Sequence, residues 1–167
     1  MQVYNELIDV LRRLRAPDGC PWDREQTHES LKAPVVEEAA EVLGAINLLK
    51  DTGDGDNLKE ELGDLLLQVI MQALIAEEEG LFTMDDVMEG LREKMIRRHP
   101  HVFGEASASD SAEVLDLWEQ VKAREKAGKD KAAPYLPEAF DEAEALIDRA
   151  RARKKIRAGG QGHSSDA

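Results

Sequence analysis

Apolar residues recur at helical spacing in two neighbouring stretches of the chain. In residues 35–49 and again in 58–73 they stand three, four and seven positions apart, which is the pattern of an amphipathic helix. Between these stretches lies Asp-Thr-Gly-Asp-Gly-Asp-Asn at 51–57, a composition typical of a turn. The pattern therefore predicts two consecutive helices, about 30–50 and 58–79, joined by a short connection.

The same spacing predicts helices along most of the remaining chain. Pro17, Gly19 and Pro21 interrupt it early and predict an irregular loop, whereas Gly80 is suited to end the helix that precedes it. We therefore expect an all-α fold, with further helices at about 2–15, 84–98, 112–127 and 137–155.

Each of the two central helices carries an acidic cluster beside its apolar face. The first, Glu-Glu-x-x-Glu, ends at Glu41, and the second, Glu-Glu-x-x-Asp, ends at Asp64. On a helical wheel, Glu38 lies roughly 80° and Glu41 roughly 140° from the centre of the apolar face. Glu61 and Asp64 lie at about the same two angles on their own helix. Packed as an antiparallel hairpin, the two helices could bring all four carboxylates toward one cleft.

Four carboxylates in one cleft repel one another unless cations neutralise them. Oxygen ligands suit Mg²⁺ or Mn²⁺ better than zinc or copper, so the pattern indicates a hard-metal site. A single acidic cluster on a helix is more often a solvated face. The matched phase of two clusters on consecutive helices is what favours a metal site, with the ligands Glu38, Glu41, Glu61 and Asp64.

The composition supports one helical domain with an acidic surface. The chain has 167 residues, of which 42% are hydrophobic and only 4% aromatic, and this mixture favours helices. Its 35 acidic and 22 basic residues give a net charge of −13, which argues against a general nucleic-acid binder. A nucleotide ligand remains compatible with this charge, because a metal and a few local cations can meet its phosphates.

Cysteine content and hydropathy indicate the compartment. Cys20 is the only cysteine, which excludes an intrachain disulfide and fits a reducing cytosol. The N-terminus lacks the continuous apolar core of a signal peptide, and no apolar run approaches the ~18 residues of a membrane span. We therefore expect a cytoplasmic protein without a membrane partner.

A basic cluster stands at the end of the predicted helix 84–98. Lys94 and Arg98 lie one turn apart, with Arg97 beside them, so they could reach one phosphate group. The same cations could instead complement the negative end of the helix dipole. In so acidic a chain, a tight basic cluster favours phosphate binding.

Both tryptophans are candidates for stacking on a nucleobase. Trp118 shares a helix face with Lys122, which would place an aromatic platform beside a cation. Trp22 lies in the proline-rich loop. Each tryptophan could equally cover the edge of the core, the more usual role of such a residue.

A series of motifs along the chain resembles, in order, the MazG family of all-α nucleoside triphosphate pyrophosphohydrolases. They are Gly-Cys-Pro-Trp-Asp at 19–23, the two acidic clusters, Glu-Leu-Gly-Asp-Leu-Leu at 61–66, and Arg-Arg-His-Pro-His-Val-Phe at 97–103. The similarity covers about residues 1–127, which we take as a MazG-like domain. A linker and helix at 128–156 and a disordered tail at 157–167 are expected to follow.

The resemblance implies a Mg²⁺-dependent hydrolase, with Mn²⁺ as a substitute, that converts a nucleoside triphosphate to the monophosphate and pyrophosphate. It also implies a homodimer, or a dimer of dimers, whose paired helices complete a four-helix core. The positions that match the family are the metal-binding Glu38, Glu41, Glu61 and Asp64, the phosphate-contacting Lys94 and Arg98, and, more loosely, the base-side pair Trp118 and Lys122.

This reaction requires water to attack a phosphorus while pyrophosphate leaves. Glu37 or Glu38 could orient or deprotonate that water, and their spacing does not choose between them. A di-iron carboxylate oxidase is a rival helical-bundle enzyme. It expects Glu-x-x-His, and neither acidic helix has a histidine at that spacing.

The chain departs from the family pattern in three ways. Many MazG proteins carry two tandem copies of the domain, and this chain has one. Ala40 stands where the family commonly has Tyr, and Gly44 stands where an Asp frequently follows one turn after the first cluster. The missing acid keeps a second function open, a catalytically weak helical dimer that acts as a regulatory or interaction module.

Overall fold

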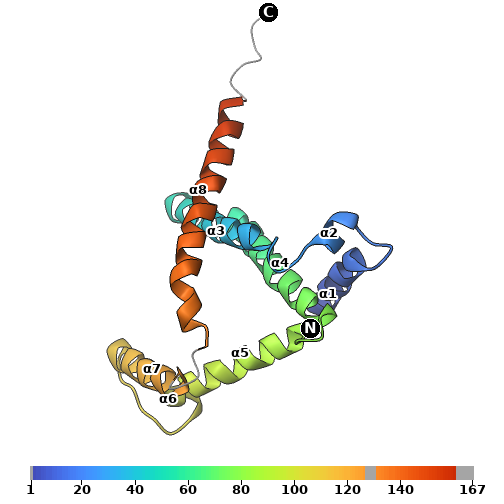
Figure 1. Ribbon diagram of the computed structural model, residues 1–167. Helices are drawn as coiled ribbons and strands as arrows, with labels where there is room; N and C mark the ends of the chain where they lie inside the picture. Colours follow the sequence, from blue (N-terminus) through green and yellow to red (C-terminus); the bar gives the residue numbers. More distant parts are fainter. Residues whose placement is uncertain (1, 127–130, 161–167) are drawn as a thin grey trace, which may run out of the picture.

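All regular secondary structure that the computed structural model describes is helical (Figure 1), which confirms the predicted all-α fold. The structure describes residues 2–126 and 131–160. In chain order the elements are α1 (Gln2–Arg15), α2 (Pro21–Glu25), α3 (Lys32–Thr52), α4 (Asp56–Glu78), α5 (Met84–Arg98), α6 (Pro100–Phe103), α7 (Ser111–Lys126), the 3₁₀ helix η1 (Ala133–Tyr135) and α8 (Leu136–Gly160). None of the described helices combines the length and apolar composition that crossing a membrane requires.

The helices α3 and α4 pack side by side as the predicted hairpin (Figure 1). Their connection is shorter than expected, because α3 continues to Thr52 and α4 already begins at Asp56. Gly53 ends α3 with a φ of 77°, a left-handed conformation that favours glycine. The Asp56 N–H then donates to the Asp54 carboxylate over 3.0 Å, so a polar side chain starts the second helix.

The core lies where the C-terminal half of α4 meets α1 and the start of α5. Buried residues of α4 pack there against Ile8 and Leu11 of α1 and against Met84 of α5. Leu31, just before α3, packs with Met71 and Ile75 in a second buried cluster. The buried residues of α4 are Gln68, Ile70, Met71, Ala73, Leu74, Ile75 and Ala76. This half of α4 anchors the fold, and it leaves the acidic N-terminal half accessible.

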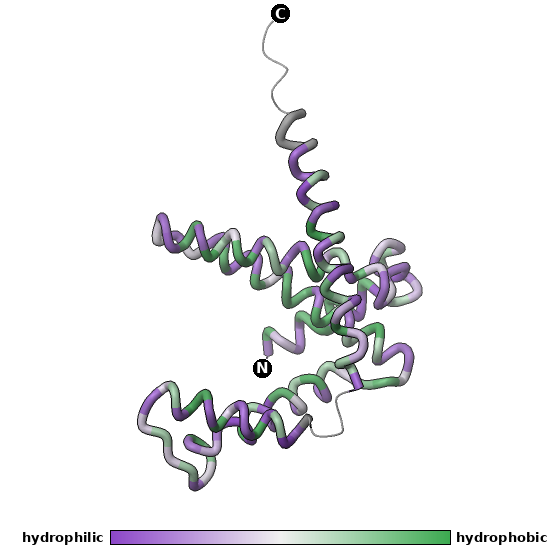
Figure 2. Tube along the Cα trace, turned by 60° about the vertical axis from the view of Figure 1, so that its left-hand side comes forward, coloured by the Kyte–Doolittle hydropathy of each residue, from purple (hydrophilic) through white to green (hydrophobic). Residues whose placement is uncertain are grey.

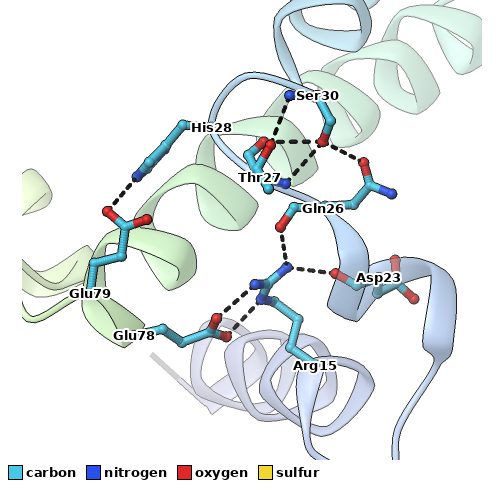
Figure 3. Close-up of polar contacts among 8 residues, drawn as sticks. All are labelled: Arg15, Asp23, Gln26, Thr27, His28, Ser30, Glu78 and Glu79. Carbon is cyan, nitrogen blue, oxygen red and sulfur yellow. Dashed lines mark hydrogen bonds and ion pairs between the residues drawn. The ribbon is translucent and has the colours of Figure 1, made fainter.

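Arg15, the last residue of α1, ties the following loop to the end of α4 (Figure 3). Its side chain is only 6% exposed and donates two hydrogen bonds of 2.7 Å to the Glu78 carboxylate. It also donates to the backbone carbonyls of Asp23 and Gln26. The loop was predicted to be irregular, and it contains the short helix α2, which these contacts hold in place.

Capping groups determine the turn between α4 and α5. The Leu81 N–H donates to the Ala76 carbonyl over 2.9 Å while Gly80 adopts a φ of 70°, a Schellman arrangement that ends α4. Thr83 and Asp86 then form a capping box, in which each side chain accepts a hydrogen bond from the other residue's backbone N–H. Together these contacts place the start of α5 at the predicted residue.

The molecule is open, with an arm on either side of the hairpin. The helix α5 leads away from the hairpin to α6 and α7, while α8 returns to pack against α3 (Figure 1). Hydrophobic positions recur along the hairpin and along the α5–α7 arm (Figure 2). Several large apolar side chains of the hairpin are between 42% and 64% exposed, namely Leu43, Ile46, Leu62, Leu66 and Val69. One chain therefore leaves an apolar face of the hairpin uncovered.

The C-terminal part differs from the prediction in its boundaries. The helix α8 extends to Gly160, so residues 157–160, expected in a disordered tail, are helical. The rest of that expected tail, 161–167, lies outside the described residues, as does the linker segment 127–130. The short helices α2, α6 and η1 were not predicted, because three to five residues carry too little periodicity to be recognised.

Replacing Arg15 with alanine should lower the free energy of unfolding by about 2 kcal/mol, because it leaves a carboxylate and two carbonyls without their donor. The Arg15 hydrogen bonds hold the pKa of Glu78 below its ordinary value. The stability that these bonds contribute is therefore fully present above the pKa of Glu78 in the unfolded protein. It is lost as the pH falls through the pKa of Glu78 in the folded protein. Urea unfolding at neutral and acidic pH measures both effects.

The matched control is Arg13→Ala, since Arg13 pairs with Asp18 in a largely exposed ion pair. We expect that change to cost less than about 0.5 kcal/mol. Equal losses in the two variants would contradict the role given to Arg15.

Candidate metal centre

Three of the four predicted ligands meet between the two central helices. Oxygen atoms of Glu38 on α3 and of Glu61 and Asp64 on α4 all lie within 4.8 Å of one another. Glu38 and Glu61 are partly buried, while Asp64 is exposed, so the group opens to solvent on one side. The hairpin and the matched helical phase together produce this arrangement, which the wheel analysis anticipated for these three acids.

Local contacts orient the acids that α4 contributes to the site. Asn57 stands one turn before Glu61 and donates a hydrogen bond of 2.9 Å to its carboxylate. Gln68 stands one turn after Asp64, is buried, and has a side-chain oxygen without a hydrogen-bond partner among the described residues. The acids of α4 therefore lie along a polar stripe that runs from the helix start into its buried half.

The electrostatics of Glu38 reflect crowding by like charges. Partial burial, which is the largest cause, raises the pKa of Glu38 above its ordinary value. The neighbouring carboxylates raise it further, in the order Glu41, Asp64, Glu61 and Glu37. The ionised group therefore lacks sufficient compensation from the protein alone, and a bound cation would reverse the effect.

The three acids fit a hard divalent cation. Their donors are all carboxylate oxygens, the ligands that Mg²⁺ and Mn²⁺ prefer. Mg²⁺ binds oxygen at about 2.0–2.1 Å, so ligands on opposite sides of one ion stand about 4 Å apart. The oxygens of the three acids lie within 4.8 Å of one another, which is wider than the ligand spacing around one Mg²⁺, so the side chains would move closer together to bind a single ion.

The first acidic cluster also meets cations of α8. Glu41 was predicted as a fourth ligand, and its carboxylate forms an ion pair with Lys154. Glu37, one turn before it, pairs with Arg153. In this structure the group of three acids therefore excludes Glu41, whose side chain is engaged by the C-terminal helix.

The predicted phosphate-binding residues gather where α5 ends and α7 packs against it. Arg97 and Arg98 both donate to Glu125 of α7, over 3.1 Å and 2.7–2.9 Å respectively. These bonds, those from Arg98 first, hold the pKa of Glu125 below its ordinary value. Lys94 lies one turn before Arg98 on the same helix, half-buried.

Trp118 belongs to the same cluster, and its cationic neighbour is Arg98. The Arg98 Cζ atom lies 5.1 Å from the centre of the Trp118 ring, at cation–π distance. His99 packs edge-on against that ring, with 5.1 Å between ring centres. Lys122, predicted to share a ligand with Trp118, forms an ion pair of 3.1 Å with Glu119.

The cation–aromatic cluster and the three acids lie in different parts of one chain. The helix α7 packs on α5, at the end of the arm away from the hairpin (Figure 1). Trp22 is 72% exposed on α2, so within the described residues it does not cover the core edge. The fold therefore assembles the acidic half of the predicted site and leaves the cationic and aromatic candidates apart from it.

Three residues at the acidic site were not identified from the sequence: Asn57, Arg153 and Lys154. Asn57 had a usable signal, because a residue four positions before Glu61 on a helix lies on the same face. Arg153 and Lys154 belong to a basic run at 149–155 in an otherwise acidic chain. That run indicates an acidic partner surface, but only the path of α8 identifies it as the first acidic cluster.

Comparisons with known proteins agree with these motifs. Residues 26–103 match the family model described as the MazG nucleotide pyrophosphohydrolase domain. This stretch contains both acidic clusters and extends to the end of α6. The resemblance proposed from the motifs is thereby confirmed for this part of the chain.

Curated relatives extend the similarity beyond that domain. The chain is 49% identical over 127 residues to the nucleoside triphosphate pyrophosphohydrolase/pyrophosphatase MazG of Thermotoga maritima, covering 76% of this chain and 47% of that protein. It is 46% identical over 130 residues to the nucleoside triphosphate pyrophosphohydrolase of Escherichia coli K12, covering 77% and 48%. It is 53% identical over 123 residues to the uncharacterized protein YabN of Bacillus subtilis, covering 74% and 24%. The chain thus spans about half or less of each relative.

Replacing Glu38 with glutamine should stabilise the metal-free protein by about 0.2–1 kcal/mol, because it removes one of several repelling charges. The raised pKa of Glu38 means that the wild-type protein loses stability as the pH rises through that folded pKa. The variant should lack this loss. Urea unfolding in EDTA across pH 4–8 measures it.

Glu105→Gln is the control, since Glu105 is an exposed acid of the loop after α6. That change should leave the pH dependence as in the wild type. A metal-free Glu38→Gln protein less stable than the wild type at pH 8 would show that the acids are not in repulsive contact.

Proposed function

We propose that this protein hydrolyses nucleoside triphosphates to the monophosphate and pyrophosphate in a Mg²⁺-dependent reaction, because residues 26–103 match the MazG nucleotide pyrophosphohydrolase domain. The observation that supports this most directly is the meeting of Glu38, Glu61 and Asp64 between two helices. The printed names of the relatives from Thermotoga maritima and Escherichia coli point to the same activity.

In this proposal Glu38, Glu61 and Asp64 hold the divalent ion through their carboxylate oxygens. A bound ion of this kind neutralises phosphate charge and lowers the pKa of a nearby water. That water's oxygen forms a bond to phosphorus, and the bond from the same phosphorus to the pyrophosphate oxygen breaks. Pyrophosphate leaves with the bonding electron pair.

Two acids of α3 are suited to handle the proton of the attacking water. Glu38 has a raised pKa in the metal-free protein, but a cation bound to its carboxylate would reverse that shift. Glu37, whose side chain is 16% exposed, pairs with Arg153 and could orient the water by accepting a hydrogen bond. Both acids remain candidates for accepting the proton of the water.

Binding the phosphates and the base of the substrate requires cationic and aromatic side chains, and within one chain the candidates lie away from the three acids. Lys94, Arg97 and Arg98 are the candidates for the phosphates, and Trp22, Trp118 and Lys122 for the base. We propose that a second copy of the chain brings its own cation–aromatic cluster to the acids of the first. The active form would then be a homodimer, or a dimer of dimers.

The exposed apolar face of the hairpin supports this assembly. Leu43, Leu62 and Leu66 are between 44% and 64% exposed on the two acidic helices. Burying a fully exposed leucine contributes about 1.5–3 kcal/mol, so covering one of these half-exposed side chains contributes roughly half of that. A second hairpin packed on this face would complete the four-helix core that the family resemblance implies.

A second candidate function is a dimeric regulatory or interaction module with weak catalysis. Gly44 stands where the family pattern frequently has an Asp. The space there is open, since a Cβ atom at this position would meet no atom within 4 Å. Glu41 is meanwhile engaged by Lys154. With only three acids gathered, this alternative predicts little or no pyrophosphate release.

Replacing Glu61 with glutamine or Asp64 with asparagine should lower the rate of pyrophosphate release by about 10²-fold or more, because each removes a charged metal ligand. Release is measured with inorganic pyrophosphatase and a phosphate assay across a panel of nucleoside triphosphates. Glu60→Gln, an exposed neighbour outside the group, should retain activity. Wild-type protein that is inactive with every nucleotide would support the module.

Replacing Leu62 with aspartate should convert the dimer to a monomer and reduce activity by at least about tenfold, because a charge would enter the apolar contact. Light scattering coupled to gel filtration measures the mass. Val3→Asp is the control, since Val3 is 78% exposed on α1, away from the hairpin face. A fully active monomeric wild type would exclude the shared site.

A further inference from the structure

The C-terminal helix lies over the first acidic cluster. Among the described residues of α8, Arg153 pairs with Glu37 and Lys154 pairs with Glu41. The two acids are one turn apart on α3, so two neighbouring residues of α8 engage both. The helix α8 lies beyond residues 26–103, which match the MazG domain, so this contact is an addition to that domain.

The helices α8 and α3 also pack through apolar residues beside these ion pairs. Ile147 and Ala150 of α8 line one cavity together with Val36 and Ala40 of α3, and Ala150 is buried. The ion pairs begin one turn further along α8, where the helix becomes predominantly hydrophilic (Figure 2). The apolar part of α8 can therefore stay in place while its basic end moves.

The ion pairs themselves are weak enough to be displaced. The side chains of Arg153 and Lys154 are 50% and 53% exposed, and pairs of this exposure contribute about 0–1 kcal/mol each. Beside them, a cavity of about 270 Å³ between α3 and α8 borders Glu41 and Lys154. This space leaves room for both side chains to change rotamer.

Glu41 is also the acid best placed to extend the metal site. It stands three residues after Glu38 on α3, and it is the carboxylate that affects the pKa of Glu38 most. Its carboxylate can accept either the ammonium of Lys154 or a divalent ion. The two cations exclude each other there because both require the same oxygens.

We propose that Lys154 and Arg153 compete with the divalent metal for the first acidic cluster, so that the docking of the basic end of α8 controls whether Glu41 joins the metal site. This inference rests on the proposed metal-dependent function. Lys154 acts here as a positioning residue, because it works through Glu41. Metal binding should release the basic end of α8, and removal of its cations should strengthen metal binding.

The test measures Mn²⁺ binding to the full chain by calorimetry at fixed ionic strength. We expect the variant Arg153→Ala/Lys154→Ala to bind Mn²⁺ about twofold to tenfold more tightly than the wild type, as expected for the loss of two exposed ion pairs. Lys155→Ala is the matched control, since Lys155 is the next cation of α8 and pairs with no described residue. Its affinity should equal that of the wild type. Glu61→Gln should abolish binding in every background.

Hydrogen exchange gives a second readout that does not depend on activity. In the wild type, Mn²⁺ should speed amide exchange in the segment 150–155 by at least about threefold, while the same ionic strength of NaCl should not. In the Glu61→Gln protein, Mn²⁺ should leave exchange there unchanged.

The outcomes separate this inference from the proposed function. Tight Mn²⁺ binding in the wild type with equal or weaker binding in the double variant would overturn the competition and leave the metal site standing. Slower exchange of 150–155 with Mn²⁺ would also overturn it. Absence of Mn²⁺ binding in both wild type and double variant would overturn the metal site and the competition together.

Discussion

The packing of α3 against α4 governs both the acidic site and the rest of the fold. It brings Glu38 beside Glu61 and Asp64, where partial burial and then the neighbouring carboxylates raise the pKa of Glu38, so the ionised acid is unfavourable in the metal-free protein. The opposing stabilisation comes from the other half of α4, where Ile70 and the alanines after it are almost wholly buried. One helix therefore serves two purposes along its length, with an apolar half that secures the fold and an acidic half that is free to bind a cation.

The open shape of the chain has the same origin. Leu43, Leu62 and Leu66 stay 44–64% exposed on the same hairpin that carries the acids, so the described helices leave it partly uncovered. The α5–α7 arm carries the cation–aromatic cluster away from the acids, and α8 covers only part of α3 (Figure 1). The proposed dimer would supply the missing apolar cover and the missing cations at once. In its absence, the basic end of α8 provides partial charge compensation at Glu37 and Glu41.

Much of the fold could be predicted because its determinants are local. The apolar period located α1, α3, α4, α5, α7 and α8, and Gly80 marked the end of α4 through the conformation that glycine permits. The elements that were missed are short, and tertiary contacts hold them. The loop around α2, for example, is held in part by Arg15, which lies at the end of α1 and also reaches α4 (Figure 3). No periodicity in the loop itself indicates that contact.

The same distinction between local and long-range determinants applies to the acidic site. The acids that share a helix face could be identified from residue spacing, because the angle between residues on a helix depends only on that spacing, and a short connection made the two helices neighbours. The cations that meet those acids could not be identified in this way, because they come from a distant helix. Lys154 and Glu41 are 113 residues apart, and the path of α8 across α3 brings them together. The partner of Trp118 was likewise decided by the packing of α7 on α5, which brings Arg98 over the ring while Lys122 turns to Glu119. Spacing along one helix determines the direction in which each side chain points from the helix axis. Contacts between distant helices depend on how the whole chain packs.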